Sequence, residues 1–353
     1  MTVGIICEYN PLHIGHKKQI DRIRETFGDG VTIVCAMSGN FVQRGAPAIL
    51  EKSCRARAAI VSGADLVLEL PVTTSLSSAE GFAAGGVSIL GKFCDYLCFG
   101  AETADGSALL HAAQAQLSAD FPPLLRQPNN ILGMEYCKAI LSQGCAMKPF
   151  PIHRQGSYHA EIADSENPSA TAVRNLMLTA YNWKSCVPKQ AREIFAHAPL
   201  HTIAAGERAI LAKLRTMNDA EFEALPYGSE GLWRKFMHAC REEATLEEIV
   251  TATKSKRYTR TRIQRMVMCA FLGITREILE AEVPYTRVLA FNGKGREILR
   301  AAKKEMPFRN LGEKTNHPYF QLEQQWGSLY GLFRTDTPEA PDMEARQRIY
   351  YQK

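Results

Sequence analysis

Short apolar runs alternate with segments of helical periodicity along the first half of the chain. The runs are rich in Val, Ile and Leu, which is typical of strands buried on both faces of a sheet. Between them apolar side chains recur at helical spacing, as at Ile20, Ile23 and Phe27. The predicted strands cover residues 3–7, 31–36, 65–71, 96–100 and 147–153. This alternation predicts an α/β fold with a Rossmann-like, doubly wound parallel sheet of five strands.

The pattern changes near residue 185, after which strand signals become rare. A chain of 353 residues is long enough for two domains, because a single core rarely grows beyond about 250–300 residues. We therefore predict an α/β domain over residues 1–184 and a mostly helical domain over residues 185–353. The second half shows helical periodicity at residues 188–196, 204–217, 230–241, 246–253 and 259–271, and one late strand at 286–291.

Composition changes this picture only a little. Hydrophobic residues make up 46% and charged residues 22%, as in ordinary soluble proteins, and the net charge of +5 is weak support for nucleic acid. The ten cysteines contain no C-x-x-C pair, so no metal site is predicted and reduced thiols are expected. No apolar stretch reaches the ~18 residues of a membrane span, and no secretory signal precedes the first strand. We expect a cytoplasmic protein without a membrane partner.

The first candidate site lies where the first predicted strand meets the first predicted helix. His13, Gly15 and His16 follow a buried strand and an Asn-Pro turn, in the pattern HxGH. Helix-start N–H groups favour an anion, glycine allows close approach, and two histidines three apart share one side of the first turn. His13 and His16 are the catalytic candidates, because they could stabilise charge on phosphate oxygens. The context favours an ATP phosphate site over two surface histidines.

Polar loops follow the other predicted strands as well. Parallel sheets bind ligands beyond the carboxyl ends of their strands, so we expect these loops to converge on one crevice. The loop at residues 38–47 carries Asn40 and Arg44, and a guanidinium there could grip a carboxylate or a phosphate. Arg154 leaves the fifth strand and suits a triphosphate contact. A plain connecting loop and a surface arginine are the alternatives for these two segments.

Two predicted helix starts carry further candidates. Asn130 lies near the start of a helix at about residues 128–142, where its amide could read a base or a ribose, although capping is the simpler explanation. Ser169 opens another helix and Arg174 follows about one turn later, which suits a second anion site. A capped helix with a surface arginine explains the same pair.

A basic run lies in the predicted helical domain, at residues 254–265, and contains no acidic residue. Such a concentration of positive charge around an aromatic ring favours contacts with a nucleic-acid backbone and with one stacked base. The alternative is a solvated helix face. The RNA-binding candidates are Lys254, Lys256, Arg257, Tyr258, Arg260 and Arg262.

Taken together, these motifs resemble one known family. The strand, the HxGH loop and the helix on a parallel sheet are similar to HIGH-type nucleotidyltransferases. The fuller set resembles the bacterial tRNA(Met) cytidine acetate ligase family, in motif order from residue 3 to about 300. It consists of GIICEYNPLHIGH, MSGNFVQRGAPAI, DLVLELP, FGAE, NNILGMEY, SATAVR and KSKRYTRTR. The chain departs from the pattern common in the family at Ile14, Ala46 and Ala160.

The resemblance implies an enzyme that activates acetate with ATP as acetyl-adenylate and releases pyrophosphate. For such a step we expect Mg²⁺ as a cofactor at the phosphates. The acetyl group would then pass to N4 of the wobble cytidine in the anticodon loop of elongator tRNA(Met), which forms N4-acetylcytidine and AMP. Asn40 and Arg44 are candidates for acetate or phosphate. The ATP-binding candidates, from the resemblance and the motifs together, are Cys7, Glu8, Tyr9, Asn10, Gly15, His16, Ile20, Gly100, Asn130, Arg154, Ser169 and Arg174.

Two other functions fit parts of the sequence. A small-molecule adenylyltransferase would use the same ATP site, but it would not need a basic helical domain. A non-catalytic RNA-binding protein would not need the intact histidine pair of HxGH. Transfer of labelled acetate to cytidine in one tRNA would separate the three functions.

Overall fold

Five parallel strands form the centre of the molecule. The computed structural model describes residues 1–116, 128–153 and 168–353. The central strands run in the order β5-β2-β1-β6-β7, and every neighbouring pair is parallel. The five predicted strands and the doubly wound α/β class are confirmed. The strands are β1 (Thr2–Cys7), β2 (Thr32–Ser38), β5 (Leu66–Leu70), β6 (Tyr96–Ala101) and β7 (Lys148–His153).

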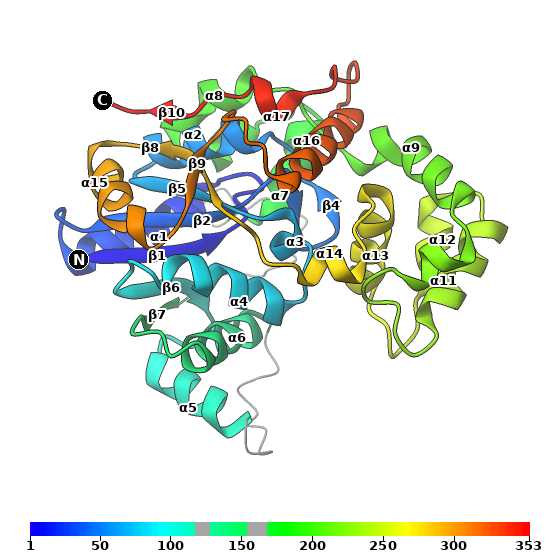
Figure 1. Cartoon of the computed structure of the whole chain (residues 1–353). Coiled ribbons are helices and arrows are strands. Elements are labelled where there is room, and N and C mark those ends of the chain that lie inside the picture. Colours follow the sequence, from blue (N-terminus) through cyan, green and yellow to red (C-terminus); the bar gives the residue numbers. More distant parts are fainter. Residues whose placement is uncertain (117–127, 154–167) are drawn as a thin grey trace.

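Three further strands come from the C-terminal part of the chain. β8 (Thr286–Phe291) pairs antiparallel with β5, and both β9 (Phe308–Asn310) and β10 (Tyr350–Tyr351) pair parallel with β8. The late strand predicted at residues 286–291 is confirmed, and it lies on the sheet, not among the helices that precede it (Figure 1). The division of the chain into two domains at residue 184 stays a prediction. The structure shows in addition that the C-terminal part of the chain returns to the sheet.

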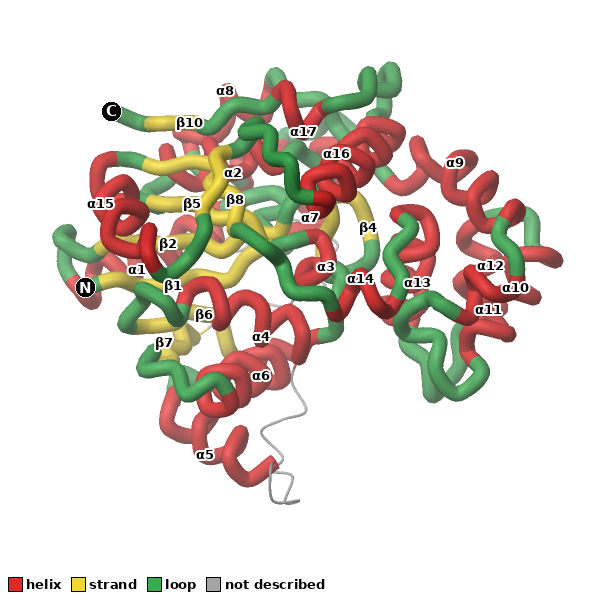
Figure 2. The backbone as a smooth tube through the Cα atoms, viewed as in Figure 1, coloured by secondary structure: helices red, strands yellow, loops and turns green. Residues whose placement is uncertain are grey.

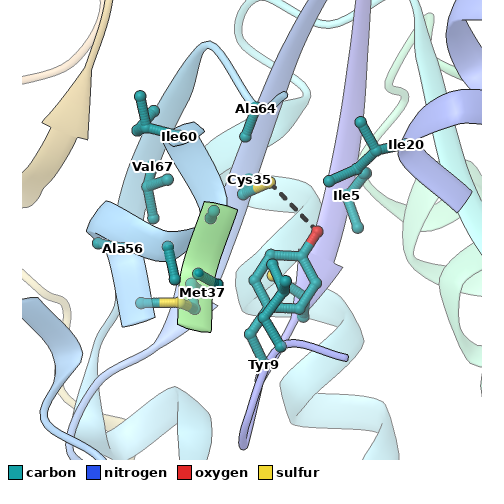
Figure 3. Packing of buried hydrophobic residues seen from close by; sticks show 14 of the residues in the cluster. Ile5, Tyr9, Ile20, Cys35, Met37, Ala56, Ile60, Ala64 and Val67 are labelled. Carbon is teal, nitrogen blue, oxygen red and sulfur yellow. Dashed lines mark hydrogen bonds between the residues drawn. The ribbon is translucent and has the colours of Figure 1, made fainter. Parts of the chain in front are cut away.

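Helices cover both faces of the sheet. Successive side chains of a strand point to opposite faces, and Ile5 and Ile6 of β1 accordingly belong to two different core clusters. Figure 3 shows the first cluster, which contains Ile5, Ile20 and Ile60. This face carries α1 (Ile14–Phe27), α2 (Lys52–Val61), α7 (Ala170–Leu178) and α8 (Arg192–Ala196). The other face carries α4 (Ala79–Leu90), α5 (Gly106–Gln116), α6 (Pro128–Ser142) and α15 (Gly293–Ala301).

A second core lies beside the sheet and is built mainly from helices (Figure 2). Phe236, Ile263 and Trp326 lie at its centre and are each at most 1% exposed. Its helices are α9 (Ile203–Thr216), α10 (Asp219–Glu223), α11 (Leu232–Glu242), α12 (Leu246–Thr253), α13 (Arg260–Leu272), α14 (Arg276–Glu280) and α16 (Pro318–Tyr330). The short helices are α3 (Val72–Ser75), η2 (Trp183–Cys186), η3 (Lys189–Ala191), η4 (Ala302–Lys304), η5 (Gly331–Phe333) and α17 (Met343–Arg346). Over the described ranges, no helix combines the length and the apolar character that a bilayer span requires.

A hairpin that follows β2 joins the two cores. Its strands β3 (Phe41–Val42) and β4 (Ala46–Pro47) are antiparallel, and Phe41 packs in the helical core with its ring centroid 5.8 Å from that of Tyr330. The Tyr330 hydroxyl donates a hydrogen bond to the carbonyl oxygen of Ala48 at 2.8 Å. Arg265 of α13 donates through Nη1 to a carbonyl oxygen of the hairpin turn at 3.4 Å. The loop that carries Asn40 and Arg44 is therefore anchored in the helical part of the molecule.

The turn of this hairpin generates a stability prediction. Gly45 has a φ of +72°, and a Cβ there would lie 2.3 Å from the backbone carbon of Gln264 on α13. We predict that Gly45→Ala lowers the free energy of unfolding by about 1–3 kcal/mol, because the turn and α13 cannot both keep their places. Urea denaturation measures the loss. Gly30→Ala is the control, since a Cβ at Gly30 meets nothing within 4 Å, and equal stability of the two variants would contradict the argument.

Candidate active site

The candidate site lies at the carboxyl end of β1, where the order of the strands changes direction. β2 and β5 lie on one side of β1 and β6 and β7 on the other, so the β1–β6 boundary is the topological switch point. Doubly wound sheets bind their ligands in the crevice at such a point. The loop after β1 and the start of α1 lie at this boundary, where Gln19 Nε2 of α1 donates to the carbonyl oxygen of Cys98 on β6 at 3.4 Å.

His13 and His16 close the first turn of α1 as a reciprocal pair. His13 is the N-cap, and its Nδ1 accepts a hydrogen bond from the Gly15 N–H at 3.1 Å. His16 Nδ1 accepts from the His13 N–H at 3.3 Å, and the two rings stack with their centroids 3.8 Å apart. A Cβ on Gly15 would lie 2.9 Å from the His13 ring, which explains the glycine between the two histidines. The rings share one side of the turn, as their spacing predicts.

The capping bonds determine which ring nitrogen carries the hydrogen. A nitrogen that accepts a hydrogen bond is unprotonated, so acceptance at each Nδ1 assigns the hydrogen of the neutral ring to Nε2. Each Nε2–H is then a donor beside a helix N-terminus, where backbone N–H groups and the dipole attract phosphate. His13 is 3% exposed and His16 is partly buried. This arrangement suits the stabilisation of charge on a bound triphosphate.

Three of the predicted ATP-binding residues place their side chains in the core. Tyr9 is 1% exposed, and its hydroxyl lies 3.6 Å from Cys35 Sγ on β2 (Figure 3). Cys7 and Ile20 belong to the same core cluster. Burial raises the pKa of Tyr9 and the pKa of Cys7, so both groups are neutral at pH 7. Contact between these three residues and ATP would run through their backbone, and it stays a prediction.

The polar side chains of the first loop bind it to its neighbours. Glu8 Oε1 accepts from a backbone N–H of the hairpin turn at 2.8 Å, and Asn10 Oδ1 accepts from the Ile49 N–H at 2.8 Å. Arg174 of α7 donates through Nη1 to the carbonyl oxygen of Asn10 at 2.7 Å. Ser169 caps the same helix with its hydroxyl. The second predicted anion site, with Ser169 and Arg174, therefore lies next to the HxGH loop, and its role in ATP binding stays a prediction.

One buried arginine that sequence reasoning missed connects these loops. Arg55 of α2 is 0% exposed. Its Nη1 donates to the carbonyl oxygens of Glu8 at 2.6 Å and Ser38 at 3.0 Å, its Nη2 donates to that of Gly39, and its Nε donates to that of Leu50 at 2.8 Å. A guanidinium presents five N–H donors in a rigid plane, which suits several carbonyl groups at once. Arg55 thus holds the loops after β1 and β2 in one arrangement.

Asn40 and Arg44 occupy different parts of the hairpin loop. Asn40 is 4% exposed, and its Oδ1 accepts from the Lys52 N–H at the start of α2, at 2.9 Å. Lys52 Nζ pairs with Glu69 at 2.8 Å and with Glu344 at 2.7 Å. This charge cluster lines a narrow hollow that is partly open to solvent. Arg44 lies in the hairpin turn and is partly buried. The assignment of Asn40 and Arg44 to acetate or phosphate stays a prediction.

On the other side of the switch point, the loop after β6 is bonded to the start of α6. Asn130 is 1% exposed, and its Oδ1 accepts from the N–H groups of Glu102 and Thr103 at 3.1 and 3.2 Å. Glu102 Oε2 accepts in return from the Asn130 N–H at 2.8 Å. Gly100 lies in β6 directly before this loop. Contacts of Gly100 and Asn130 with ATP stay predictions, and Arg154 lies outside the described residues.

The basic run connects α12 to α13 and continues into α13. Lys254, Lys256 and Arg257 are exposed. Acidic side chains from neighbouring segments pair with part of the run, since Arg257 Nη2 lies 2.5 Å from Glu230 Oε1 and Arg260 pairs with Glu247. The run itself contains no acidic residue, but the fold brings Glu230 and Glu247 from other segments next to it. The contacts with RNA stay a prediction. Lys254 and Lys256 belong to the exposed part of the run.

Tyr258 lies where it does not favour base stacking. The side chain is 9% exposed and belongs to the helical core. The guanidinium carbon of Arg262 lies 5.1 Å from the ring centroid, and the same guanidinium donates to the carbonyl oxygen of Tyr227 at 2.8 Å. A base would have to displace Arg262 or the core around the ring to stack there. We expected an exposed ring available for stacking, but the ring is buried. An aromatic residue inside a basic run can also anchor that run to the core, and Tyr258 does so.

Known proteins match the chain over almost its whole length. The family model described as HIGH Nucleotidyl Transferase matches residues 1–120 and 111–344. The tRNA(Met) cytidine acetate ligase of Clostridium novyi (strain NT) is 35% identical over 380 aligned positions, which cover 93% of this chain and 94% of that protein. The chain belongs to the tRNA(Met) cytidine acetate ligase family. The ligase of Limosilactobacillus reuteri (strain DSM 20016) is 33% identical and covers 97% of this chain and 98% of its own length. The resemblance read from the motifs is confirmed.

Solved structures share the fold of this member of the ligase family. A crystal structure of Thermotoga maritima TmcAL bound with alpha-thio ATP has a TM-score of 0.87 and 26% sequence identity, and the match covers 99% of this chain and 100% of that chain. The apo form of the same protein gives a TM-score of 0.88. The ATP analogue in that protein agrees with a nucleotide site in this fold.

Arg55 generates a prediction that separates positioning from mere stability. We predict that Arg55→Met lowers the free energy of unfolding by about 2–4 kcal/mol, because several buried carbonyl groups lose their donor. Because the loops after β1 and β2 lose their common anchor, the KM for ATP should also rise, measured at a temperature where the variant is still folded. Arg57→Met, on the exposed side of the same helix, is the control. An unchanged KM in a folded Arg55→Met protein would limit Arg55 to a structural role.

Proposed function

We infer that this chain is an ATP-dependent ligase that acetylates N4 of the wobble cytidine of elongator tRNA(Met). The observation that carries the inference is the histidine pair that caps α1 at the switch point of the sheet. It supports adenylate chemistry, and relatives that match the chain over more than nine tenths of its length carry the name of this ligase. The products are N4-acetylcytidine, AMP and pyrophosphate.

The reaction has two steps. An oxygen of acetate attacks the α-phosphorus of ATP, and pyrophosphate leaves with the electron pair of the bond that breaks. The N4 amine of cytidine then attacks the acetyl carbon, AMP leaves, and the nitrogen loses one proton. The lone pair of this amine is delocalised into the ring, so it needs an activated acyl donor. Bases in an anticodon loop are unpaired, which makes the wobble position accessible.

The capping histidines act on the first step. We propose that the Nε2–H of each ring donates to the phosphates and that this bond strengthens as negative charge grows on the phosphate oxygens. Arg174 of α7 donates to the same loop and Ser169 caps that helix, and we propose that they add a positive potential and a hydroxyl to the site. Mg²⁺ would be held largely by substrate phosphates and water, so we name no protein ligand for it. Asn40 and Arg44 are proposed to orient acetate or phosphate.

The helical part is proposed to bind the tRNA. Lys254 and Lys256 are exposed beside α13, and α13 contacts the hairpin turn through Arg265 and Gln264. A tRNA held by these lysines would therefore lie on an element that touches the loops of the ATP site. We expect the protein in the cytoplasm, where its tRNA substrate is found.

One incubation tests the function as a whole. The protein is mixed with ATP, labelled acetate and bulk tRNA, and the tRNA is digested to nucleosides. We expect label in N4-acetylcytidine from one tRNA species. Labelled acetyl-adenylate without label in tRNA would favour a small-molecule adenylyltransferase. Binding of tRNA with no consumption of ATP would favour a non-catalytic RNA-binding protein.

Two substitutions of His16 separate the structural role of its Nδ1 from the proposed chemical role of its Nε2. An asparagine amide can replace the Nδ1 acceptor of histidine, whereas a glutamine amide reaches the place of Nε2. We predict that His16→Asn keeps the stability of α1 but lowers acetate-dependent ATP–pyrophosphate exchange by about 100- to 1,000-fold, the loss typical of one such donor. His16→Gln should retain more exchange activity than His16→Asn.

The exposed His111 on α5 supplies the control for this comparison. His111→Ala should exchange pyrophosphate at the wild-type rate. If His16→Asn also kept the wild-type rate, the assignment of His16 to the phosphates would be wrong. Melting curves for each variant show whether a loss of exchange comes from a loss of folding.

The two open lysines of the basic run generate the tRNA prediction. Replacing Lys254 and Lys256 with alanine should weaken tRNA binding and lower the slope of log affinity against log salt by about 1–2, because two phosphate contacts are lost. Adenylate formation should persist, since these lysines lie outside the ATP loops. The control pair is Lys303 and Lys304, two exposed lysines that lie outside the basic run. Equal tRNA affinity in the two double variants would make the run a solvated face.

A further inference from the structure

Three segments that are distant in the sequence meet around a buried histidine. His201 lies between α8 and α9 and is 2% exposed. Its ring stacks on Tyr330 of α16 with centroids 4.1 Å apart, and its backbone N–H donates to the carbonyl oxygen of Ile49 at 2.9 Å. Glu51, at the start of α2, and Glu339, in the segment after η5, lie beside the ring. None of these residues has a part in the proposed ligase mechanism.

The imidazole of His201 is not satisfied by the protein groups around it. Within the described part of the chain, neither Nδ1 nor Nε2 has a hydrogen-bond partner, although both atoms are buried. A neutral imidazole has one donor and one acceptor nitrogen, and leaving such groups buried without a partner is costly. Native proteins rarely accept this cost unless a bound group or function compensates it. The backbone groups of Ile49 and Pro199 lie near the ring but make no hydrogen bond of ordinary geometry with it, so a bound group could supply the missing partner.

The two glutamates point oxygens at the same place. One ligand atom from each of Glu51, His201 and Glu339 lies within 4.8 Å of the other two. Ligand atoms of a tetrahedral site with bonds of about 2.1 Å are roughly 3.4 Å apart, so small side-chain rotations would close the triangle. Glu51 is the N-cap residue of α2, but its side chain makes no capping bond. Glu339 Oε2 is buried and has no hydrogen-bond partner among the described residues.

The charges around Glu51, His201 and Glu339 favour the binding of a cation. Arg334 is the positive group nearby, and it is engaged by Asp336, with Nε and Nη2 at 2.6 and 2.9 Å from its two carboxylate oxygens. Its Nη1 is 3.8 Å from Glu339 Oε2, which is too long for a hydrogen bond. Three carboxylates therefore face one guanidinium. Gln347 adds a buried amide oxygen without a partner in the described chain, while its Nε2 lies 3.5 Å from Glu51 Oε2.

We propose that Glu51, His201 and Glu339 form a binding site for a divalent transition-metal ion of the Zn²⁺ or Co²⁺ class. One imidazole nitrogen and two carboxylate oxygens suit these ions, whereas Mg²⁺ and Ca²⁺ prefer oxygen ligands alone. The ion would connect the start of α2, the segment before α9 and the C-terminal segment. The spacing of these ligands in the sequence gives no metal motif, which is why sequence reasoning predicted no metal.

A proton shared by the two carboxylates is the competing explanation. Burial, with the nearby Glu339 carboxylate, raises the pKa of Glu51, and a protonated carboxyl would relieve the repulsion without a metal. This explanation leaves both ring nitrogens of His201 unpaired. It also predicts that the protein binds no transition-metal ion at this place.

The test is a Co²⁺ titration of the full chain, purified in chelator, without ATP and with a competing chelator to set the affinity. Co²⁺ is the probe because cysteine ligation gives an intense sulfur-to-cobalt absorption band, and this chain has ten cysteines. We expect one equivalent to bind without that band and to raise the melting temperature, since the ion binds the folded state. Glu339→Gln and His201→Gln should each weaken binding by roughly 100-fold or more.

His197→Gln is the matched control. His197 Nε2 lies 3.6 Å from Glu193 Oε2, but the side chain is 82% exposed and no third ligand among the described residues completes a site with it. This variant should bind Co²⁺ as the wild type does. Absence of binding, the sulfur band, or unchanged affinity in Glu339→Gln would each overturn the proposal. Glu339 lies in an irregular segment, so its variant tests the site even if His201→Gln does not fold.

Discussion

The geometry of the candidate site depends on one buried guanidinium. A charge without a carboxylate partner is costly in the interior unless hydrogen bonds satisfy it, and Arg55 finds these bonds at four backbone carbonyl oxygens. Two of the contacts, at Glu8 and Gly39, lie in the loops that follow β1 and β2. Because α2 carries the guanidinium, the relative position of these loops is set by helix packing before any nucleotide binds. Such preorganisation is what electrostatic stabilisation of a transition state requires.

The histidines of HxGH combine a structural and a chemical role in the same rings. Serine, threonine, asparagine or aspartate would cap a helix as well, but their side chains are too short to place a donor as far from the backbone as Nε2 of histidine. In His13 and His16 the bond at Nδ1 fixes the orientation of the ring and the place of its hydrogen. A ring that turned out of this orientation would give up its part in the capping box. The start of α1 and the direction of the Nε2 donors are therefore coupled.

Periodicity and strand-end position were sufficient to predict the central sheet and the place of the HxGH loop, because both follow from local patterns. Long-range partners were not predictable in this way. Arg55 appears in the sequence as one arginine on an ordinary helix, and its carbonyl partners at Glu8, Ser38 and Gly39 become neighbours only after the sheet forms. Tyr258 lies in a basic run but points into the core. The strand at residues 286–291 was predictable as a strand, whereas its pairing with β5 depends on the whole topology.

The C-terminal segment that returns to the sheet also contacts α2, the helix that carries Arg55. Lys52, also in α2, is 3% exposed and pairs with Glu69 of β5 and with Glu344 of α17, which is 292 residues away in the sequence. Buried ion pairs add little net stability, because desolvation offsets the attraction, but removing one partner is costly since it leaves a charge without compensation. The cluster therefore favours one docking position for α17 over others. Since α2 carries both Lys52 and Arg55, the C-terminal segment supports the loops after β1 and β2 through that helix, in addition to the direct hydrogen bond from Tyr330 to Ala48.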